Sequence, residues 1–410
     1  MRIGMLSYHF PPEPAFLAGS LAEELAARGH QVRVLTGFPD YPGGHVYPGW
    51  RQRWHHETHS QGLTVRRVPR LTGDGTTRGP LVSHLSFAAS AAGVARRFLR
   101  GVDALYVCQH PAGVFATAAV RRVLGAVPTV LHVQGLWPGA WAADTPGRWA
   151  DRLATATRGA YRSADRVVVG TSAMRDLVVA DGAREDRVRV VLSWTDERLF
   201  RPVSASPEVR RLVGGDGRCV VLHAGTIGAG QRLETAIRAA VPLERTMELV
   251  LVGSGEREQR VREFAAEVGA RNVRFVPRRP ALEMPEWYAA ADYQLVATRD
   301  LPELSGTVPT KLPAALACAA PVVVSAGGDT AEFVESARAG LSCPPEDWAA
   351  LADRFWLAAA IPASARLEMG RRGRDAYLRQ MSLRAGVDRV ERLLHEVATE
   401  SMEKSSQLQH

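Results

Sequence analysis

The chain has 410 residues, of which 46% are hydrophobic and 23% charged, so it is long enough for about two soluble globular domains. No apolar run is long enough to span a bilayer, and Pro11-Pro12 interrupt the N-terminal apolar stretch, which argues against a signal peptide. The formal net charge of +8 lies wholly in the first half, because residues 1–200 contain 24 Arg against 16 acidic residues, whereas residues 201–410 are neutral.

The first half alternates short apolar runs with helical patterns, which is typical of a parallel sheet covered on both faces. Strands are predicted at residues 2–8, 31–36, 63–68, 104–108, 129–133, 167–170 and 188–192, and helices at 18–28, 81–99 and 151–163. Residues 200–207 are rich in Pro and Ser and lack periodicity, so we expect a linker there.

The second half repeats the alternation. Strands are predicted at residues 219–223, 248–252, 273–276, 293–297 and 321–325, and helices at 233–240, 281–290 and 385–397. We therefore predict an α/β protein with two doubly wound parallel-sheet domains, at 1–200 and 201–384, followed by a late helix at 385–400 and a disordered polar tail at 401–410. Such units bind ligands at the carboxyl ends of their strands and in the cleft between them.

The block from Glu303 to Ser325 is the strongest functional signal. It gives, in order, a loop with a carboxylate, Gly306, Pro309, a helix opened by Thr310-Lys311, and a buried strand. The first amides of a helix lack partners, so this order favours an anion site. Lys311 is one of only two lysines, with Lys404 in the polar tail, and a compact ammonium there suits a phosphate. The alternative is an ordinary surface charge.

Three glycine-containing turns follow predicted strands. They are Ala18-Gly19-Ser20, the run Gly225–Gly230, and Gly253-Ser254-Gly255. Glycine lets the backbone approach a ligand, and together with Lys311 the three turns favour a nucleotide site. Neither GxGxxG nor GxxxxGK[ST] is present, which disfavours a dinucleotide-binding oxidoreductase and a P-loop enzyme.

Other candidate residues allow two interpretations each. Glu303 would touch a sugar hydroxyl or a developing positive charge, or be a solvated loop residue. His132, at the end of a buried strand, would bond a sugar hydroxyl or phosphate, or be a satisfied core histidine. Trp137 and Trp141 would stack on a sugar or acceptor, or pack over the cleft. His55, His56 and His59 match no closed metal site, and we expect a surface loop.

Several longer segments, taken together, resemble family 4 glycosyltransferases of the GT-B fold, in the branch of exopolysaccharide and fucosamine transferases. The segments are SYHFPPE at 7–13, GSLAEELAARGHQVRVLTGFPDYPGG at 19–44, HVYPGW, LHVQGLWP, LHAGTIGAGQRLETAIRAA and VPTKLPAALACAAPVVVSAGGDTAEFV. The resemblance spans nearly the whole chain. It implies two Rossmann-like domains facing a central cleft, with a late helix that crosses back to the first domain.

The resemblance also implies roles for individual residues. Glu303 and His132 would orient the donor sugar, Lys311 would stabilise the diphosphate, and Trp137, Trp141 and His9 would serve the acceptor. The donor nucleotide and its phosphates would be held by Gly19, Ser20, Gly225, Thr226, Ile227, Gln231, Arg232, Ser254, Gly255, Pro277, Arg278, Thr307, Val308, Pro309, Thr310, Lys311 and Leu312. The chain departs from the wider family at three places: Lys311 stands at the second glutamate of its glutamate pair, Thr226 and Gln231 lie where an Arg and a Lys are usual, and Gly135 replaces an Asp.

The implied function is retaining, metal-independent transfer of a sugar from a nucleotide-diphosphate sugar, with UDP expected and no cofactor, to a lipid-linked, polysaccharide or small natural-product acceptor. A sugar-nucleotide 2-epimerase of the same fold is the alternative, and it would need more carboxylates than Glu303. A non-enzymatic binder of nucleic acid or a membrane surface is a third hypothesis, which salt dependence would test. Four scattered cysteines without a CxxC pair predict reduced thiols in a cytoplasmic protein, with peripheral membrane contact through the basic half.

Overall fold

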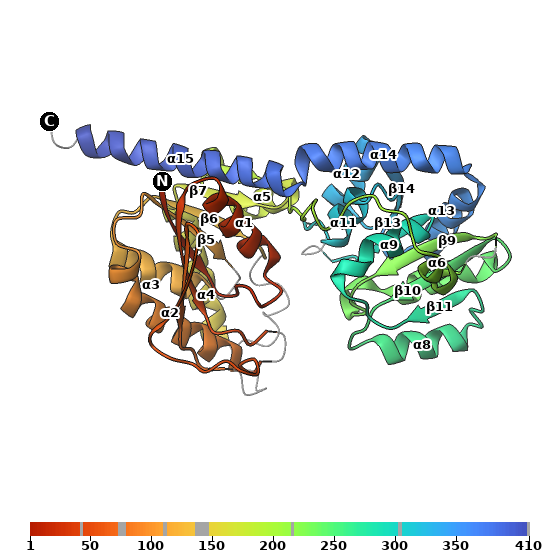
Figure 1. The fold of residues 1–410 in the computed structure, drawn as a ribbon, viewed down its shortest axis with the longest axis horizontal. Helices are drawn as coiled ribbons and strands as arrows, with labels where there is room; N and C mark the ends of the chain where they lie inside the picture. The colour runs from red at the N-terminus through yellow and green to blue at the C-terminus, as the bar shows by residue number, and fades with distance from the viewer. Residues whose placement is uncertain are drawn as a thin grey trace. The chain divides into compact units, whose positions relative to one another are not determined.

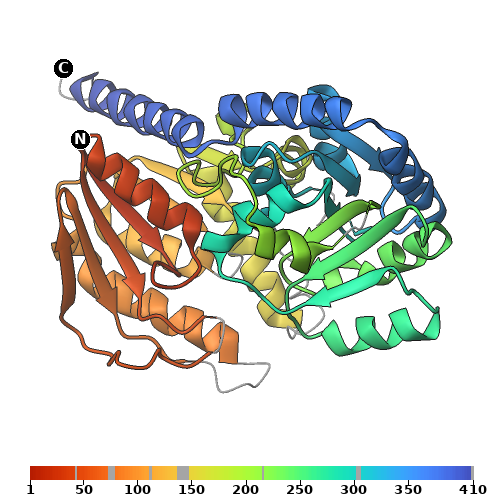
Figure 2. The same ribbon diagram turned by 45° about the vertical axis from the view of Figure 1, so that its right-hand side comes forward.

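The computed structural model describes residues 1–41, 44–72, 79–109, 113–135, 147–214, 217–301 and 306–407. By their internal contacts, these residues divide into an N-terminal unit, Met1–Val191 with Gly386–His410, and a C-terminal unit, Leu192–Ala385. Figures 1 and 2 show the two units from two directions. The division falls before residue 200, where the sequence predicted the boundary, so the segment that precedes the predicted linker belongs to the C-terminal unit.

The N-terminal unit contains an eight-stranded sheet of order β3-β4-β2-β1-β5-β6-β7-β8. Its strands are β1 (Arg2–Ser7), β2 (Gln31–Gly37), β3 (His56–Ser60), β4 (Leu63–Val68), β5 (Ala104–Gln109), β6 (Thr129–Val133), β7 (Arg166–Val169) and β8 (Val188–Val190). All pairs are parallel except β3 with β4. The segment with His56 and His59, predicted to be a loop, is therefore an edge strand, which β4 fixes by pairing His56 with Arg67.

The helices of this unit are α1 (Phe16–Ala27), α2 (Gly79–Phe98), α3 (Val114–Leu124), α4 (Gly147–Ser163), α5 (Ser172–Ala180) and, from Gly386 onward, α15 (Leu383–Gln407). One core joins the central strands to α2–α5 through residues such as Leu105, Leu131, Val120 and Tyr161. The parallel strands are buried along most of their length, which explains their continuous apolar runs.

Helix α15 packs beside α1 (Figures 1 and 2), and ion pairs join α15 to the residues that follow α1. Arg28 Nη1 lies 2.6 Å from Asp388 and 2.7 Å from Glu391, and His30 Nε2 lies 2.6 Å from Glu391. The prediction of a disordered tail at 401–410 is wrong for residues 401–407, because α15 continues to Gln407, and residues 408–410 lie outside the described part of the chain. In the last part of α15, Glu396 and Glu400 pair with Arg166.

The C-terminal unit contains a six-stranded parallel sheet of order β11-β10-β9-β12-β13-β14. The strands are β9 (Cys219–Ala224), β10 (Met247–Val252), β11 (Val273–Val276), β12 (Tyr293–Ala297), β13 (Val322–Ser325) and β14 (Gly340–Cys343). The helices are α6 (Pro207–Val213), α7 (Leu233–Ala240), α8 (Glu258–Glu267), α9 (Met284–Ala290), α11 (Lys311–Ala317), α12 (Gly328–Ala337), α13 (Trp348–Ala360) and α14 (Ala363–Gln380).

Helices cover both faces of this second sheet, because alternate residues of each strand point to opposite sides. Leu249 and Leu251 of β10 join one core with α7, α8 and α13, whereas Val250 and Val252 join another with α6, α9 and α11. The order corresponds to the doubly wound pattern that the sequence predicts, with β9 and β12 adjacent at the point where the chain direction across the sheet reverses. The four cysteines are buried and unpaired, and burial raises the pKa of Cys108 to about 12.

Candidate active site

The C-terminal unit carries its candidate site at the carboxyl ends of β9 and β12. In doubly wound sheets the crevice outside these two strands is the usual ligand site, because the loops that follow them lead to opposite faces of the sheet and leave space between them. The loop after β9 begins at Gly225, and the loop after β12 ends at Thr310, where α11 starts. Lys311, the first residue of α11, extends from the second loop to the first.

Lys311 is the centre of this site, which we call the lysine site (Lys311, His223 and Gly225). Its Nζ lies 3.2 Å from Nε2 of His223, the fully buried penultimate residue of β9. Burial lowers the pKa of Lys311 to about 8, and burial together with the nearby ammonium moves the pKa of His223 well below its ordinary value. His223 is therefore neutral at pH 7, and its Nε2 accepts a hydrogen bond from the ammonium.

The ammonium of Lys311 has no carboxylate partner in the part of the chain that the structure describes. The only cause that lowers its pKa is the loss of water around it, and no acidic group compensates. A cation in such surroundings is stabilised by an anionic ligand. That Lys311 serves an anion remains a prediction, and the surroundings of its ammonium are compatible with it.

The glycines at this site are required by close packing of two loops. A Cβ on Gly225 would lie 2.6 Å from Cε of Lys311, so glycine leaves room for the lysine side chain. A Cβ on Gly253 would lie 1.8 Å from the carbonyl oxygen of Gly225, and one on Gly255 would lie 2.3 Å from that of Ile227. Gly225 and Gly253 also have φ angles of 131° and 157°. The turns after β9 and β10 therefore pack backbone against backbone, a contact that the sequence interpretation as ligand-facing turns did not include.

The remaining predicted donor-site residues differ in whether their side chains are exposed to a ligand or already engaged within the protein. Thr226, Ser254 and Gly255 are exposed, whereas Ile227 is buried. Gln231 accepts a hydrogen bond from the Gly228 amide through Oε1 at 3.1 Å and closes its own turn. Arg232, in left-handed backbone with φ 44°, pairs with Glu346 at 2.6 Å. Gln231 and Arg232 thus have partners within the protein.

The residues before α11 are also partly engaged. The amide of Leu312, predicted to face a phosphate, donates to the carbonyl oxygen of Pro309 at 3.0 Å. The carbonyl oxygen of Thr307 accepts from the Thr330 hydroxyl at 3.1 Å, Val308 is buried, and Thr310 is exposed. Pro277 and Arg278 follow β11 and are exposed. Of the predicted charged residues that the structure describes, Lys311 is the one that lies against His223 at the switch point.

The predicted glycine turn at Ala18-Gly19-Ser20 is wrong, because α1 begins earlier, at Phe16, and includes these residues. The amide of Gly19 donates to the carbonyl oxygen of Ala15 at 3.1 Å, so it is occupied inside the helix. A Cβ on Gly19 would lie 2.4 Å from Cγ of Pro11. The glycine is thus needed for packing of α1 under the Pro11 ring.

The two predicted site histidines of the N-terminal unit, His132 and His9, differ in how far they are buried. His132 of β6 is buried, with Nδ1 2.5 Å from the hydroxyl of Tyr106, a geometry that the core interpretation also predicts. His9, after β1, is half-buried, and its Nδ1 lies 2.9 Å from Oε1 of the buried Glu13. Glu303, Trp137 and Trp141 lie outside the described residues.

The carboxylates near His9 are neutralised by arginine. Arg70 contacts Asp40 and lies 3.5 Å from Glu13, and the amides of Phe10, Asp40 and Tyr41 donate to the Glu13 carboxylate. His9, Glu13 and Asp40 are close enough to hold a metal ion, as are His30, Glu391 and His395. In both groups, however, an arginine already pairs with a carboxylate.

His223 is the residue of the lysine site that the sequence predictions missed. It lies 88 positions before Lys311, so no local pattern links them. The one available signal was a histidine at the end of the apolar run CVVLHA, directly before a glycine turn.

Two parallel-sheet units of this kind define the GT-B class of sugar-transferring enzymes, and solved structures of that class match the chain. Sucrose-phosphate synthase from Thermosynechococcus elongatus matches with a TM-score of 0.76 at 20% identity, covering 98% of this chain and 100% of that one. Anabaena HepE, solved in complex with UDP-glucose, matches with a TM-score of 0.70 at 17% identity, covering 97% and 100%.

The sequence comparisons give the family. The model of the glycosyl transferase 4-like domain matches residues 15–194, and that of the glycosyl transferases group 1 matches residues 218–357. The colanic acid biosynthesis glycosyl transferase WcaI of Escherichia coli (strain K12) is 27% identical over 80% of this chain and 83% of its own length. A D-inositol 3-phosphate glycosyltransferase of Acidothermus cellulolyticus is 33% identical over 44% of this chain and 42% of its own.

The chain belongs to the family 4 glycosyltransferases, in the branch of the exopolysaccharide type, and is therefore a glycosyltransferase of the GT-B fold. The fold, the family and the enzyme class predicted from the sequence are confirmed. Among the described residues, no helix combines the length and the apolar character that a membrane crossing requires.

Proposed function

We propose that this enzyme transfers a sugar, with retention of anomeric configuration and without a metal ion, from a UDP-linked donor to a hydroxyl of a saccharide acceptor. The observation that carries the proposal is the ammonium of Lys311, which lies partly buried at the switch point against a neutral imidazole, with no described carboxylate beside it. In a glycosyltransferase, the anion that requires such a cation is the diphosphate leaving group of the donor.

The proposed reaction takes place on one face of the donor sugar. The acceptor hydroxyl oxygen forms a bond to C1 of the sugar while the bond from C1 to the β-phosphate oxygen breaks. The acceptor proton passes to that departing oxygen, which gains the electron pair. Lys311 stabilises the negative charge that develops on the diphosphate, and the low dielectric around a mostly buried ammonium strengthens that interaction.

Independence from metal is part of this proposal, and the positive charge of Lys311 at the switch point supports it. In metal-dependent diphosphate sites, carboxylates hold the cation. The two groups of metal-type ligands found among the described residues, His9 with Glu13 and Asp40 and His30 with Glu391 and His395, both belong to the N-terminal unit. Lys311 supplies the compensating charge in place of such an ion.

The other roles follow the family pattern and remain part of the proposal. Glu303 and His132 orient the donor sugar, Pro277 and Arg278 flank the base, and exposed Thr226 and Ser254 contact the phosphates. Trp137, Trp141 and His9 contact the acceptor. HepE was solved with UDP and UDP-glucose, which supports a UDP donor, and the name of WcaI, a colanic acid biosynthesis enzyme, supports an acceptor from polysaccharide assembly.

The first test is a thermal-shift panel of nucleoside diphosphates in the presence of EDTA, on the wild type, Lys311→Ala and the matched variant Lys404→Ala. We expect UDP to raise the melting temperature of the wild type and of Lys404→Ala, and not that of Lys311→Ala. Stabilisation that appears only when a divalent ion is added would contradict metal independence. Equal stabilisation of all three proteins would show that Lys311 does not hold the diphosphate.

Retention can be tested without knowing the acceptor, because water can replace it slowly. UDP-glucose, an α-linked donor, is incubated with the enzyme, and the released glucose is followed by proton NMR before its anomers equilibrate. α-Glucose should appear first. Initial release of β-glucose would rule out the front-face mechanism while leaving the donor site intact.

A further inference from the structure

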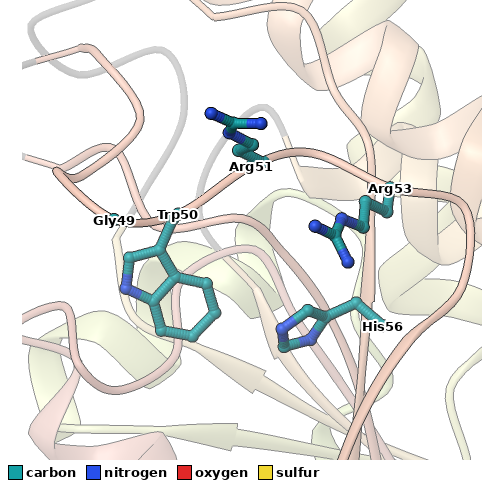
Figure 3. Close-up of a pocket in the computed structure, with 5 residues that line it drawn as sticks. All are labelled: Gly49, Trp50, Arg51, Arg53 and His56. Atoms are coloured by element: carbon teal, nitrogen blue, oxygen red, sulfur yellow. The ribbon is translucent and has the colours of Figure 1, made fainter.

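The N-terminal unit contains a cavity that is lined by cationic and aromatic side chains. Its volume is about 390 Å³, and Gly49, Trp50, Arg51, Arg53 and His56 line it (Figure 3). We call it the arginine pocket. In Figure 3 the guanidinium of Arg53 lies beside the imidazole of His56, with the indole of Trp50 across from them and Arg51 above. The volume is within the range of small-molecule sites, which is roughly 300–1,000 Å³.

The backbone around the arginine pocket is fixed by hydrogen bonds on either side of each arginine. Oε1 of Gln52 accepts from the amide of Arg70 at 2.7 Å, and Arg66 Nη2 donates to the carbonyl oxygen of Trp54 at 2.7 Å. The amide of Trp50 donates to the carbonyl oxygen of Tyr47 at 3.0 Å. Gln52 is half-buried in this contact, whereas Arg51 and Arg53 on either side of it are exposed.

The two arginines are not used by the protein itself. Arg51 and Arg53 are exposed, and no hydrogen bond or ion pair joins either of them to another described residue. Arg66, by contrast, pairs with Glu57, and Arg70 pairs with Asp40. Nδ1 of His56 is buried and likewise has no partner among the described residues. The arginine pocket therefore gathers two guanidinium groups without partners among the described residues, and none of its lining residues carries a carboxylate.

Trp50 gives the arginine pocket an aromatic wall that is held in place from behind. The guanidinium carbon of Arg67 lies 4.9 Å from the centroid of the indole, and the ring centroids of Trp50 and His56 are 5.4 Å apart. Arg67 in turn donates to the carbonyl oxygen of Gly37 at 2.8 Å. An indole fixed in this way offers a flat surface for a sugar ring, while arginine forks match phosphate oxygens.

We propose that the arginine pocket binds a phosphoryl group of the acceptor, with Arg51 and Arg53 on the phosphate oxygens and Trp50 against the attached sugar. This inference rests on the proposed function, since it concerns the acceptor of the same transferase. It selects, among saccharide acceptors, those that carry a phosphate or diphosphate. An uncharged natural product would leave both arginines without a partner.

The test measures binding of inorganic pyrophosphate by calorimetry at constant ionic strength, in a Lys311→Gln background that weakens the donor site. The added pair Arg51→Gln and Arg53→Gln is compared with the pair Arg96→Gln and Arg97→Gln, which removes the same charge from exposed arginines of α2. We expect the pocket pair to weaken binding by at least about thirtyfold, because charge-assisted hydrogen bonds are lost, and the control pair by less than about twofold.

Equal weakening by both pairs would overturn the proposal, because it would indicate attraction to overall charge. Absence of saturable pyrophosphate binding would overturn it as well. Vesicles of phosphatidylcholine, with and without phosphatidylglycerol, distinguish a lipid surface: arginine-dependent binding to the anionic vesicles without pyrophosphate binding would assign Arg51 and Arg53 to the membrane. Every protein in this comparison carries Lys311→Gln. A negative result with pyrophosphate therefore says nothing about UDP binding by the wild type, which the thermal-shift panel tests separately.

Discussion

The lysine site and the arginine pocket both present positive groups that have no carboxylate partner among the described residues, but the protein builds the two sites in different ways. The lysine site contains a mostly buried ammonium between loops that touch backbone to backbone at Gly225 and Gly253. The arginine pocket has exposed guanidinium groups on a segment held by the side chains of Gln52 and Arg66. A buried charge on a rigid frame suits stabilisation of a leaving group, whereas exposed charges suit capture of a substrate.

The largest expected effect concerns the frame of the lysine site. A Cβ in Gly253→Ala would meet the carbonyl oxygen of Gly225 at 1.8 Å, so the two loops must separate. We expect a loss of about 3 kcal/mol in the free energy of unfolding, measured in urea. Gly49→Ala in the arginine pocket is the matched change: its φ is also positive, at 83°, but nothing lies within 4 Å of the added Cβ.

Gly49→Ala should therefore cost only the backbone strain, about 1 kcal/mol. The contrast would fail if the two substitutions destabilised the protein equally, since loop packing would then not distinguish the two sites.

The second effect separates function from stability at Lys311. In Lys311→Met, we expect UDP affinity to fall by about a hundredfold, because a charge-assisted contact of 1.5–3 kcal/mol is lost. The melting temperature at pH 7 should not fall. The pKa of Lys311 is about 8 in the folded protein, below the ordinary 10.5, so the side chain is charged at pH 7 in the folded and the unfolded protein alike. The folded protein then carries the full cost of desolvating the ammonium, and Lys311→Met removes that cost. A variant that loses both affinity and stability would point to a structural lysine.

The third prediction is a pH dependence of the same contact. UDP affinity should decrease by about tenfold between pH 7 and pH 9, because the Lys311 ammonium, with a pKa of about 8, loses its proton in that interval. The phosphates titrate near pH 6 and stay ionised throughout. Calorimetry at pH 7, 8 and 9 would measure the slope, and Lys311→Met should remove it. An affinity that rises with pH would contradict the assignment.

The smallest effect is expected from removing Gln52, which anchors the segment that carries Arg51 and Arg53. Gln52→Ala removes the hydrogen bond from the Arg70 amide, so the segment between Arg51 and Arg53 loses one anchor. Stability should fall by about 1 kcal/mol, and pyrophosphate affinity in the Lys311→Gln background by a few-fold. Full affinity in Gln52→Ala would show that the segment does not need that anchor.

The parts of the fold and of the site that depend on local sequence order could be predicted from the sequence. The buried strands follow from continuous apolar runs such as that of β10, and Lys311 follows from a loop, helix and strand in sequence. The tail could not be predicted in this way. Its polar composition resembles a disordered end, but α15 continues to Gln407, and Arg166, more than 200 positions away, pairs with Glu396 and Glu400 just before the tail begins.

The site features that were missed depend on contacts between distant residues. A glycine after a strand reads the same whether it faces a ligand or another loop, and only the approach of Gly253 to Gly225 and of Gly19 to Pro11 decides the matter. The same holds for His223, whose role appears only when Lys311 reaches it. No motif marks Arg51 and Arg53, because their significance lies in the absence of partners, which a sequence does not record.

The central claim, that Lys311 holds the donor diphosphate, is tested most directly by a crystal structure of the enzyme with UDP, grown in the presence of EDTA. We predict a β-phosphate oxygen about 3 Å from Nζ of Lys311, the ordinary length of a charged hydrogen bond, above the turn that begins at Gly225. A diphosphate bound elsewhere, with Lys311 contacting only His223, would contradict it.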